Sequence, residues 1–251
     1  MSYRSHIRPN FLLAYPIMLS MLGQVMTGVA DSVMIGWTGA TPLAASSFAN
    51  IFFSIPLFFG IGVSYAITPL VAQAEGAHDE SSIINTLKNG ALINLTTGFI
   101  LVALIFSVIP FMHSMGQPED AVTLAIPYLG IIAVSIIPTM IFQTYRQFAE
   151  GLQRTRMAMV IVVGSNLLNI ALNYVLIFGK YGFPELGLNG AGWATLVARI
   201  VMAASMMLYI YYGRKFQAYK SGFSIGNYSR TLISKMLHIG LPAGSQFIFE
   251  A

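Results

Sequence analysis

The stretch FLLAYPIMLSMLGQVMTGVADSVMIGW, residues 11–37, decides the fold class of this chain. It is apolar over more than the roughly 20 residues that a helix needs to cross the hydrocarbon core of a bilayer. Within it lies one acid, Asp31. An ionisable side chain inside a membrane is energetically costly and usually faces a protein interior or a water-filled cavity, where it binds or relays ions. The stretch therefore predicts a membrane-spanning helix and makes Asp31 the first functional candidate.

The composition agrees with a membrane protein. Of the 251 residues, 56% are hydrophobic and only 9% are charged, whereas a soluble domain carries about 25% charged residues. The net charge of +4 alone would fit a nucleic-acid partner, but the positions of the charges argue for lipid, and no nucleic acid is expected. The absence of cysteine excludes disulfides and thiolate metal sites.

Apolar segments of membrane-spanning length recur along the chain and predict an all-α polytopic protein. Prolines inside them, Pro16, Pro56, Pro127 and Pro138, mark expected bends. The seven candidate segments are residues 10–37, 42–71, 83–109, 121–149, 157–179, 189–212 and 231–251.

The basic residues of the connections fall almost entirely on one side of these segments. One side holds eleven and the other only Lys180, while Arg199 lies within the sixth segment. Because cytoplasmic loops are enriched in Lys and Arg, this bias predicts a multi-pass protein of the cell (inner) membrane with a cytoplasmic N-terminus. The eleven are Arg4, Arg8, Lys88, Arg146, Arg154, Arg156, Arg214, Lys215, Lys220, Arg230 and Lys235.

A cleaved secretory signal is an alternative interpretation of the N-terminus, because Arg4, Arg8 and an apolar run precede Gly28-Val-Ala30. The apolar run continues to Trp37, however, and therefore favours a retained helix.

The organisation predicts one six-helix lobe, residues 1–228, followed by the start of a second lobe at residues 229–251. The polar stretch 213–230 separates the two, and the last segment stops within an apolar run, as expected for a fragment of a longer protein. Gln24 lies eight residues after Pro16 of Ala14-Tyr-Pro16, and Glu250 lies eight residues after Pro242 of Gly240-Leu-Pro242. This similarity favours a weak parallel repeat.

Polar residues follow one face of the first segment. Gln24, Thr27 and Asp31 are spaced i, i+3, i+7. Beside them runs a series of small residues suited to close helix packing, Gly28, Ser32 and Gly36. A buried structural carboxylate is the alternative, but an intramembrane acid favours a functional role.

The fifth segment repeats this spacing with three amides, Asn166, Asn169 and Asn173. Their oxygens suit a hard cation such as Na⁺, although hydrogen bonding between helices is an equally good interpretation of the triplet alone. Thr195 of the sixth segment offers a further oxygen, whereas Arg199 is interpreted as structural, paired with an acid or reaching the cytoplasmic surface.

Two further acids lie within or at the end of the apolar segments. Glu250, eight residues after Pro242, is a candidate proton site or counter-ion for a cationic substrate, while Glu150 is spaced i, i+4 from Arg146 and predicts a local ion pair. Common nucleotide-binding and hydrolase motifs are missing, so no enzyme and no cofactor are expected.

Several of these stretches together resemble the multidrug and toxic compound extrusion (MATE) transporters, and in particular their NorM branch. The resemblance covers the whole chain and rests on residues 16–36 around Asp31, Val71-Ala-Gln73-Ala-Glu-Gly76-Ala77, residues 166–179, Gly190-Ala-Gly-Trp193-Ala-Thr195, and Leu241-Pro242 with Glu250.

This resemblance implies the amino-terminal half of a twelve-helix, two-lobe antiporter that exports organic cations and drugs in exchange for Na⁺ or H⁺. It implies that Asp31, Asn169, Asn173 and Thr195 form an ion-coupling site, with Asp31, Asn169 and Asn173 as Na⁺ ligands. Gln24, Thr27, Asn166 and Glu250 are expected to line a substrate or proton cavity. An archaeal branch carries aspartate where this chain has Asn173, so one negative charge is absent here.

Two other functions fit parts of the pattern. A flippase for lipid-linked intermediates of the same superfamily would need a basic, lipid-accessible cleft, for which only Arg199 and Lys180 lie away from the cytoplasmic side. A seven-helix receptor or retinal protein disagrees with the cytoplasmic N-terminus and with the lack of a lysine in the middle of the seventh segment.

Overall fold

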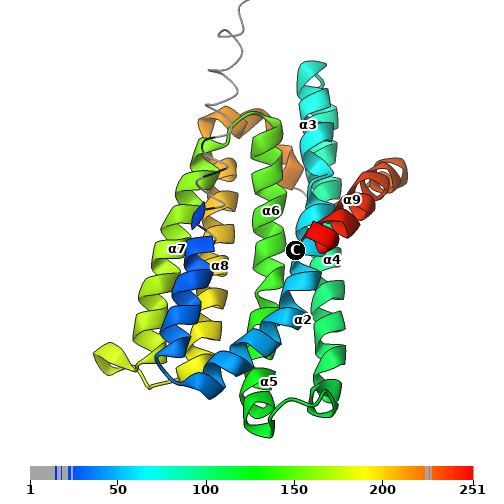
Figure 1. The fold of residues 1–251 in the computed structure, drawn as a ribbon. Helices are drawn as coiled ribbons and strands as arrows, with labels where there is room; N and C mark the ends of the chain where they lie inside the picture. Colours follow the sequence, from blue (N-terminus) through cyan, green and yellow to red (C-terminus); the bar gives the residue numbers. More distant parts are fainter. Residues whose placement is uncertain are drawn as a thin grey trace, which may run out of the picture.

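A computed structural model of the chain describes residues 15, 18, 22, 23, 25–223, 226 and 228–250. This part is built from α-helices joined by short turns and 3₁₀ segments, as the sequence predicts (Figure 1). In chain order the elements are the first helix Val25–Gly36, α2 Ala40–Ser64, α3 Ile67–Gly76, α4 Glu80–Val108, η1 Ile109–Ser114, α5 Glu119–Val134, α6 Ile136–Gly151, α7 Arg156–Ile177, η2 Lys180–Gly182, α8 Gly187–Tyr212, η3 Arg214–Phe223 and α9 Arg230–Glu250.

Five helical stretches of the described chain are long and apolar enough to cross a membrane, namely Ala40–Gly76, Glu80–Ser114, Glu119–Gly151, Arg156–Ile177 and Gly187–Tyr212. They match the second to sixth predicted segments and stand roughly side by side, with their connections at alternating ends (Figure 1). The first helix is shorter in its described part. The chain is therefore a multi-pass helical membrane protein.

Two of the long stretches are interrupted, and a proline accounts for each break. α2 and α3 separate at Tyr65–Ala66, and α5 and α6 separate at Ser135. Pro69 and Pro138 are the third residues of α3 and α6, where a missing N–H is tolerated but the helix before it cannot continue unchanged. The bend expected at Pro138 is confirmed, whereas the break ahead of Pro69 was not predicted.

The other prolines of the sequence behave differently. Pro56 and Pro127 lie inside α2 and α5, which continue through them, so neither proline interrupts its helix. Pro16 lies outside the described residues.

The seventh predicted segment forms α9, which crosses α2 and approaches α4 at a steep angle (Figure 1). It is not among the five membrane-length apolar helices of the described chain. A Cβ atom placed on Gly62 would lie 2.5 Å from Cα of Gly244, and one on Gly240 would lie 2.7 Å from the carbonyl oxygen of Val63. The crossing therefore requires glycine at these positions.

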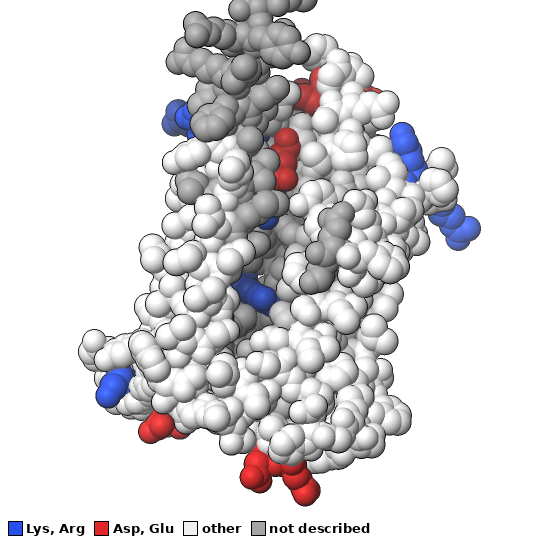
Figure 2. All heavy atoms as spheres, viewed as in Figure 1, with Lys and Arg blue, Asp and Glu red and all other residues white. Residues whose placement is uncertain are grey.

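Basic side chains are concentrated at one end of the bundle. The α6–α7 turn and η3 carry Arg154, Arg156, Lys215 and Lys220 at one end. Acidic side chains lie at both ends: some appear at the lower end of Figure 2, whereas Glu75, Asp79 and Glu80 lie at the basic end, where α3 passes into α4. The concentration of Lys and Arg at one end agrees with the bias that the sequence predicts.

Asp79 begins α4 at the basic end of the bundle. Its carboxylate accepts hydrogen bonds from the hydroxyl of Ser82 at 2.6 Å, the amide of Ser82 at 3.0 Å and the hydroxyl of Ser81 at 2.8 Å. These donors, the Ser82 hydroxyl first, lower the pKa of Asp79 to about 2. The carboxylate is therefore a permanent cap on the first turn of α4.

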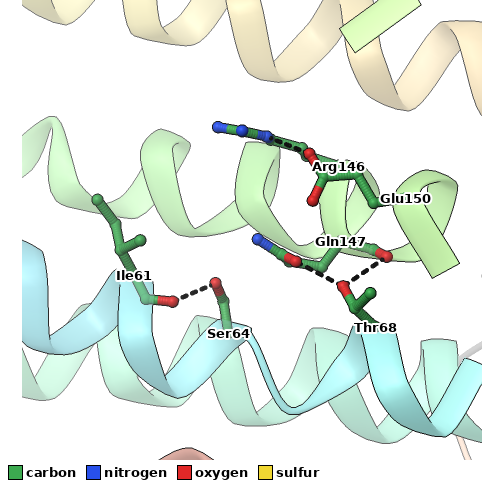
Figure 3. Close-up of polar contacts among 6 residues, drawn as sticks. All are labelled: Ile61, Ser64, Thr68, Arg146, Gln147 and Glu150. Atoms are coloured by element: carbon green, nitrogen blue, oxygen red, sulfur yellow. Dashed lines mark hydrogen bonds and ion pairs between the residues drawn. The ribbon is translucent and has the colours of Figure 1, made fainter. Parts of the chain in front are cut away.

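A polar cluster lies where α2 and α3 separate, against α6 (Figure 3). The hydroxyl of Thr68 contacts the side-chain oxygen of Gln147 at 2.5 Å, and Nε of Arg146 donates to Oε1 of Glu150 at 2.8 Å. The predicted local ion pair is thus confirmed, but it is largely buried, with only 7% and 12% of the two side chains exposed.

Replacing Arg146 with Met should destabilise the protein by about 3 kcal/mol, because it leaves the Glu150 charge buried and unpaired. The double variant Arg146→Met/Glu150→Leu should recover most of this loss, since no lone charge remains. Thermal denaturation in detergent measures both, and equal losses in the two variants would contradict a buried, mutually compensating pair.

Candidate ion-coupling site

A continuous chain of side-chain hydrogen bonds connects α8, α7 and the first helix. Nδ2 of Asn169 donates to Oγ1 of Thr195 at 3.3 Å. Nδ2 of Asn173 contacts Oδ1 of Asn169 at 3.3 Å and Oδ1 of Asp31 at 2.5 Å. The four residues expected to form an ion-coupling site therefore lie together, although 142 positions separate Asn173 from Asp31 in the sequence.

The close approach of α7 and α8 positions the middle of this chain. Asn169 and Asn173 are four residues apart, so they occupy one face of α7. That face is buried, with 4% of Asn169 and none of Asn173 exposed. A Cβ atom on Gly190 of α8 would lie 2.5 Å from the carbonyl oxygen of Leu176 in α7, so the lack of a side chain there lets the two helices meet.

The first helix presents Asp31 to α7 from its inner face. Met34 and Ile35 on the same helix are buried, whereas Val29 and Val33 are about half exposed. Asp31 itself is partly buried and accepts the hydrogen bond from Asn173. The carboxylate thus points to the bundle and not to the apolar outer face, as an intramembrane charge requires.

Buried oxygen atoms with spare acceptor capacity give this site its chemistry. Oδ1 of Asn173 is buried and has no hydrogen-bond partner among the described residues. Together with the Asp31 carboxylate, the amide oxygen of Asn169 and the hydroxyl of Thr195, it makes an all-oxygen group with one formal negative charge. Such a group suits a proton or a small hard cation. Within the described residues no cluster of three or more His, Cys, Asp or Glu could hold a metal.

Arg199, which the sequence did not assign to the site, interacts with it. Arg199 of α8 donates from Nη1 to Oγ of Ser135 at 2.7 Å, lies 4.9 Å from the ring centre of Phe53, and interacts electrostatically with Asp31 and Tyr128. Its guanidinium therefore turns inward at the α5–α6 break and does not extend to the cytoplasmic surface. An arginine inside an apolar segment was the available signal, because such a charge rarely faces lipid.

The predicted cavity residues have different outcomes. Nδ2 of Asn166 is buried without a described partner and would lie 2.9 Å from a Cβ atom on Gly23, so Asn166 faces the first helix. The Thr27 hydroxyl donates to the carbonyl of Gly23 in its own helix at 2.9 Å. Gln24 and the side chain of Glu250 lie outside the described residues.

The small-residue series of the first helix is not a packing face within the described chain. Nothing lies within 4 Å of a Cβ atom on Gly28, and Ser32 is exposed and bonds the carbonyl of Gly28. The expectation of tight packing there is wrong for this part of the molecule. The reason is that the inner face of the helix is occupied by Asp31, Met34 and Ile35.

Taken together, these features define a polytopic helical membrane protein with a polar, oxygen-lined site between its first helix, α7 and α8. Comparison with known proteins identifies the family. The MatE family model matches residues 16–175, and the chain belongs to the MatE family.

Curated relatives agree with this assignment. The chain is 32% identical to the probable multidrug resistance protein NorM of Rhizobium meliloti (strain 1021), over 99% of the chain and 53% of that protein. It is also 32% identical to the probable NorM of Synechocystis sp. (strain ATCC 27184 / PCC 6803 / Kazusa), over 98% of the chain and 54% of that protein. The predicted resemblance to the NorM branch is confirmed. The chain spans about half the length of these relatives.

Solved structures share the fold. An outward-facing multidrug resistance MATE family transporter matches with a TM-score of 0.81 at 23% identity, over 94% of the chain and 51% of that structure. An inward-facing multidrug resistance MATE family transporter matches with a TM-score of 0.80 at 21% identity, over 94% of the chain and 54% of that structure. The relatives carry the names of resistance proteins and transporters, in agreement with the prediction that the chain is not an enzyme.

Replacing Gly190 with Val should separate α7 from α8 and lower the apparent melting temperature by roughly 5–10 °C, because the new side chain meets backbone and cannot rotate away. Gly164→Ala in α7 is the matched control, since nothing lies within 4 Å of its added Cβ. Thermal denaturation in detergent compares the two, and an unchanged Gly190→Val melting temperature would contradict the close α7–α8 contact.

Proposed function

We propose that the chain is the amino-terminal lobe of a secondary active antiporter that exports organic cations and drugs in exchange for Na⁺ or H⁺. In this proposal residues 1–228 form the lobe and residues 229–251 begin a second six-helix lobe. The observation that carries it is the hydrogen-bonded chain from Thr195 through Asn169 and Asn173 to Asp31. The NorM relatives are named probable multidrug resistance proteins, which supports drugs as substrates.

The coupling follows from the cost of the Asp31 charge. Asp31 forms no ion pair in the described chain, and Arg199 acts on it only at longer range. Because such a carboxylate is costly in a low-dielectric bundle, binding of H⁺ or Na⁺ at Asp31 stabilises the conformation that holds this site together. A cationic substrate that favours the opposite-facing conformation then binds reciprocally with the coupling ion. Inward movement of one positive charge across a 100 mV potential supplies about 2.3 kcal/mol.

Neutral oxygens have a distinct role in this mechanism. Asn173 donates to the carboxylate through Nδ2 and keeps Oδ1 free, while Asn169 and Thr195 hold the Asn173 amide in place. An incoming cation would therefore bind the Asp31 carboxylate and amide oxygens without a second buried negative charge. Gln24, Thr27, Asn166 and Glu250 are proposed to line the substrate or proton cavity.

The membrane side and location also belong to this proposal. The basic residues of the α6–α7 turn and of η3 support a cytoplasmic position for that end of the bundle, in a protein of the cell (inner) membrane.

Asp31→Asn should reduce ion-driven efflux at least about tenfold, because the neutral amide can neither bind a proton nor neutralise a cation. Proteoliposomes containing the full-length protein, with an imposed Na⁺ or pH gradient, measure this and identify the coupling ion. Ser32→Ala is the control, since its exposed hydroxyl bonds only its own helix. Full gradient-driven efflux by Asp31→Asn would rule out the role of Asp31.

Asn173→Asp should strengthen binding of the coupling cation about tenfold or more. Two carboxylates at hydrogen-bond distance repel each other, and a bound cation allows both to stay charged. Cation-dependent thermal stabilisation of purified protein measures the affinity. Asn166→Asp is the comparison, since Asn166 has no described hydrogen bond to Asp31. Equal or weaker cation binding by Asn173→Asp would contradict direct participation of this position.

A further inference from the structure

A cavity lined by several basic residues lies at the basic end of the bundle and contains none of the residues of the Asp31 site. It has a volume of about 480 Å³ and lies between the α6–α7 turn and the region where α8 passes into η3. Its lining includes three basic residues, Arg154, Arg156 and Lys215, together with Thr155, Met157 and Tyr209. The proposed antiport mechanism uses none of these residues.

The three basic side chains are not neutralised by acids. The ion pair found in the described chain is Arg146–Glu150, and none of the three takes part in it. Arg154 lies over the ring of Phe216 at 5.6 Å from its centre, which orients the guanidinium without cancelling its charge. Glu75, Glu80 and Arg154 all interact electrostatically with Tyr219. Neither acid forms an ion pair with Arg154. The cavity is therefore electropositive.

The amino-terminal end of α7 opens onto this cavity with unused donors. Thr155 occupies the cap position before Arg156, but its side chain makes no capping hydrogen bond. Only 8% of Thr155 is exposed, yet its hydroxyl has no hydrogen-bond partner in the part of the chain that the structure describes, and the residue lines the cavity. The first backbone N–H groups of a 22-residue helix lie beside it. Uncapped N–H groups and a free hydroxyl are donors for an anion with several oxygens.

The surroundings place this cavity at a membrane surface. Met157, Val160 and Leu167 follow one side of α7 and are 38%, 53% and 64% exposed, an apolar stripe suited to acyl chains. Tyr211 and Tyr212 are exposed at the end of α8, as expected for aromatic side chains at the headgroup level. Basic pockets between helices on the cytoplasmic side bind phosphorylated lipid headgroups.

We propose that this cavity binds a phosphate ester, with Arg154, Arg156 and Lys215 neutralising its charge and the Thr155 hydroxyl and first turn of α7 donating to its oxygens. Anionic phospholipids of the cytoplasmic leaflet present this group at the height of the cavity, and soluble phosphorylated compounds present the same chemistry. The cavity shares no residue with the Asp31 site, and binding to it can be tested without measuring transport.

Thermal stabilisation of the full-length protein in neutral detergent provides the test, with short-chain phosphatidylglycerol, short-chain phosphatidylcholine and inorganic phosphate as separate probes. Phosphatidylglycerol should stabilise the wild type, and phosphatidylcholine should not. The triple variant Arg154→Gln/Arg156→Gln/Lys215→Gln should bind phosphatidylglycerol at least about tenfold more weakly, because it loses three charges.

The control variant Arg214→Gln/Arg230→Gln/Lys235→Gln removes the same charge from exposed positions outside this cavity, and it should retain wild-type binding. Thr155→Val keeps every charge and should weaken binding at least about tenfold, through loss of one hydrogen bond to a charged group. This second variant keeps the proposal testable if the triple variant does not fold.

The outcomes are distinct. Stabilisation by phosphatidylglycerol alone supports a lipid ligand, and stabilisation by inorganic phosphate with the same variant dependence supports a soluble phosphate ligand in the same site. Equal losses in the triple and control variants would overturn the proposal, because they would reveal unspecific attraction to basic charge. Absence of stabilisation by either anionic probe would overturn it as well.

Discussion

The contact between Asp31 and Asn173 is the interaction on which the candidate site depends. It joins a partly buried carboxylate on the first helix to a fully buried amide on α7. A carboxylate in an apolar bundle needs compensation from hydrogen bonds or a cation, and the amide supplies part of it. A proton or Na⁺ would compensate the rest of the Asp31 negative charge. The proposed coupling therefore depends on the same electrostatic cost that favours the hydrogen bond between the two helices.

The scaffold around this contact is specified by a few local features. Gly190 lets α7 and α8 approach closely enough for Asn169 to reach Thr195. Ser135 is buried at the break between α5 and α6, and its hydroxyl accepts a hydrogen bond from the Arg199 guanidinium. Arg199 therefore contributes a second charge to the same interior. It offsets the Asp31 carboxylate at longer range and leaves the hydrogen-bonding positions of Asp31 to Asn173.

Sequence patterns predicted the helices and much of the site because both depend on periodicity. The i, i+3, i+7 spacing of Asn166, Asn169 and Asn173 puts them on one face in any helix, and long apolar runs identify the membrane-spanning stretches. The inward path of Arg199 could not be predicted, since it depends on the position of Ser135 in another helix. The open space at Gly28 is likewise a property of the assembled bundle, because small-residue spacing does not say whether another helix is present.

The break before Pro69 shows a similar limit. Proline spacing alone does not distinguish Pro56, through which α2 continues, from Pro69, which begins α3. The difference lies in the surroundings: beside the break at Tyr65–Ala66, the side-chain hydroxyl of Thr68 bonds Gln147 of α6. The two breaks, at Tyr65–Ala66 and Ser135, thus each coincide with a polar contact between helices.

Infrared difference spectroscopy of the purified full-length protein tests most directly whether Asp31 binds the coupling cation. Addition of Na⁺, or acidification, should change one carboxyl stretching band, and that change should be missing from Asp31→Asn and altered in frequency by Asn173→Leu, which removes the hydrogen bond to the carboxylate. A cation-induced carboxyl band that persists unchanged in Asp31→Asn would contradict the account.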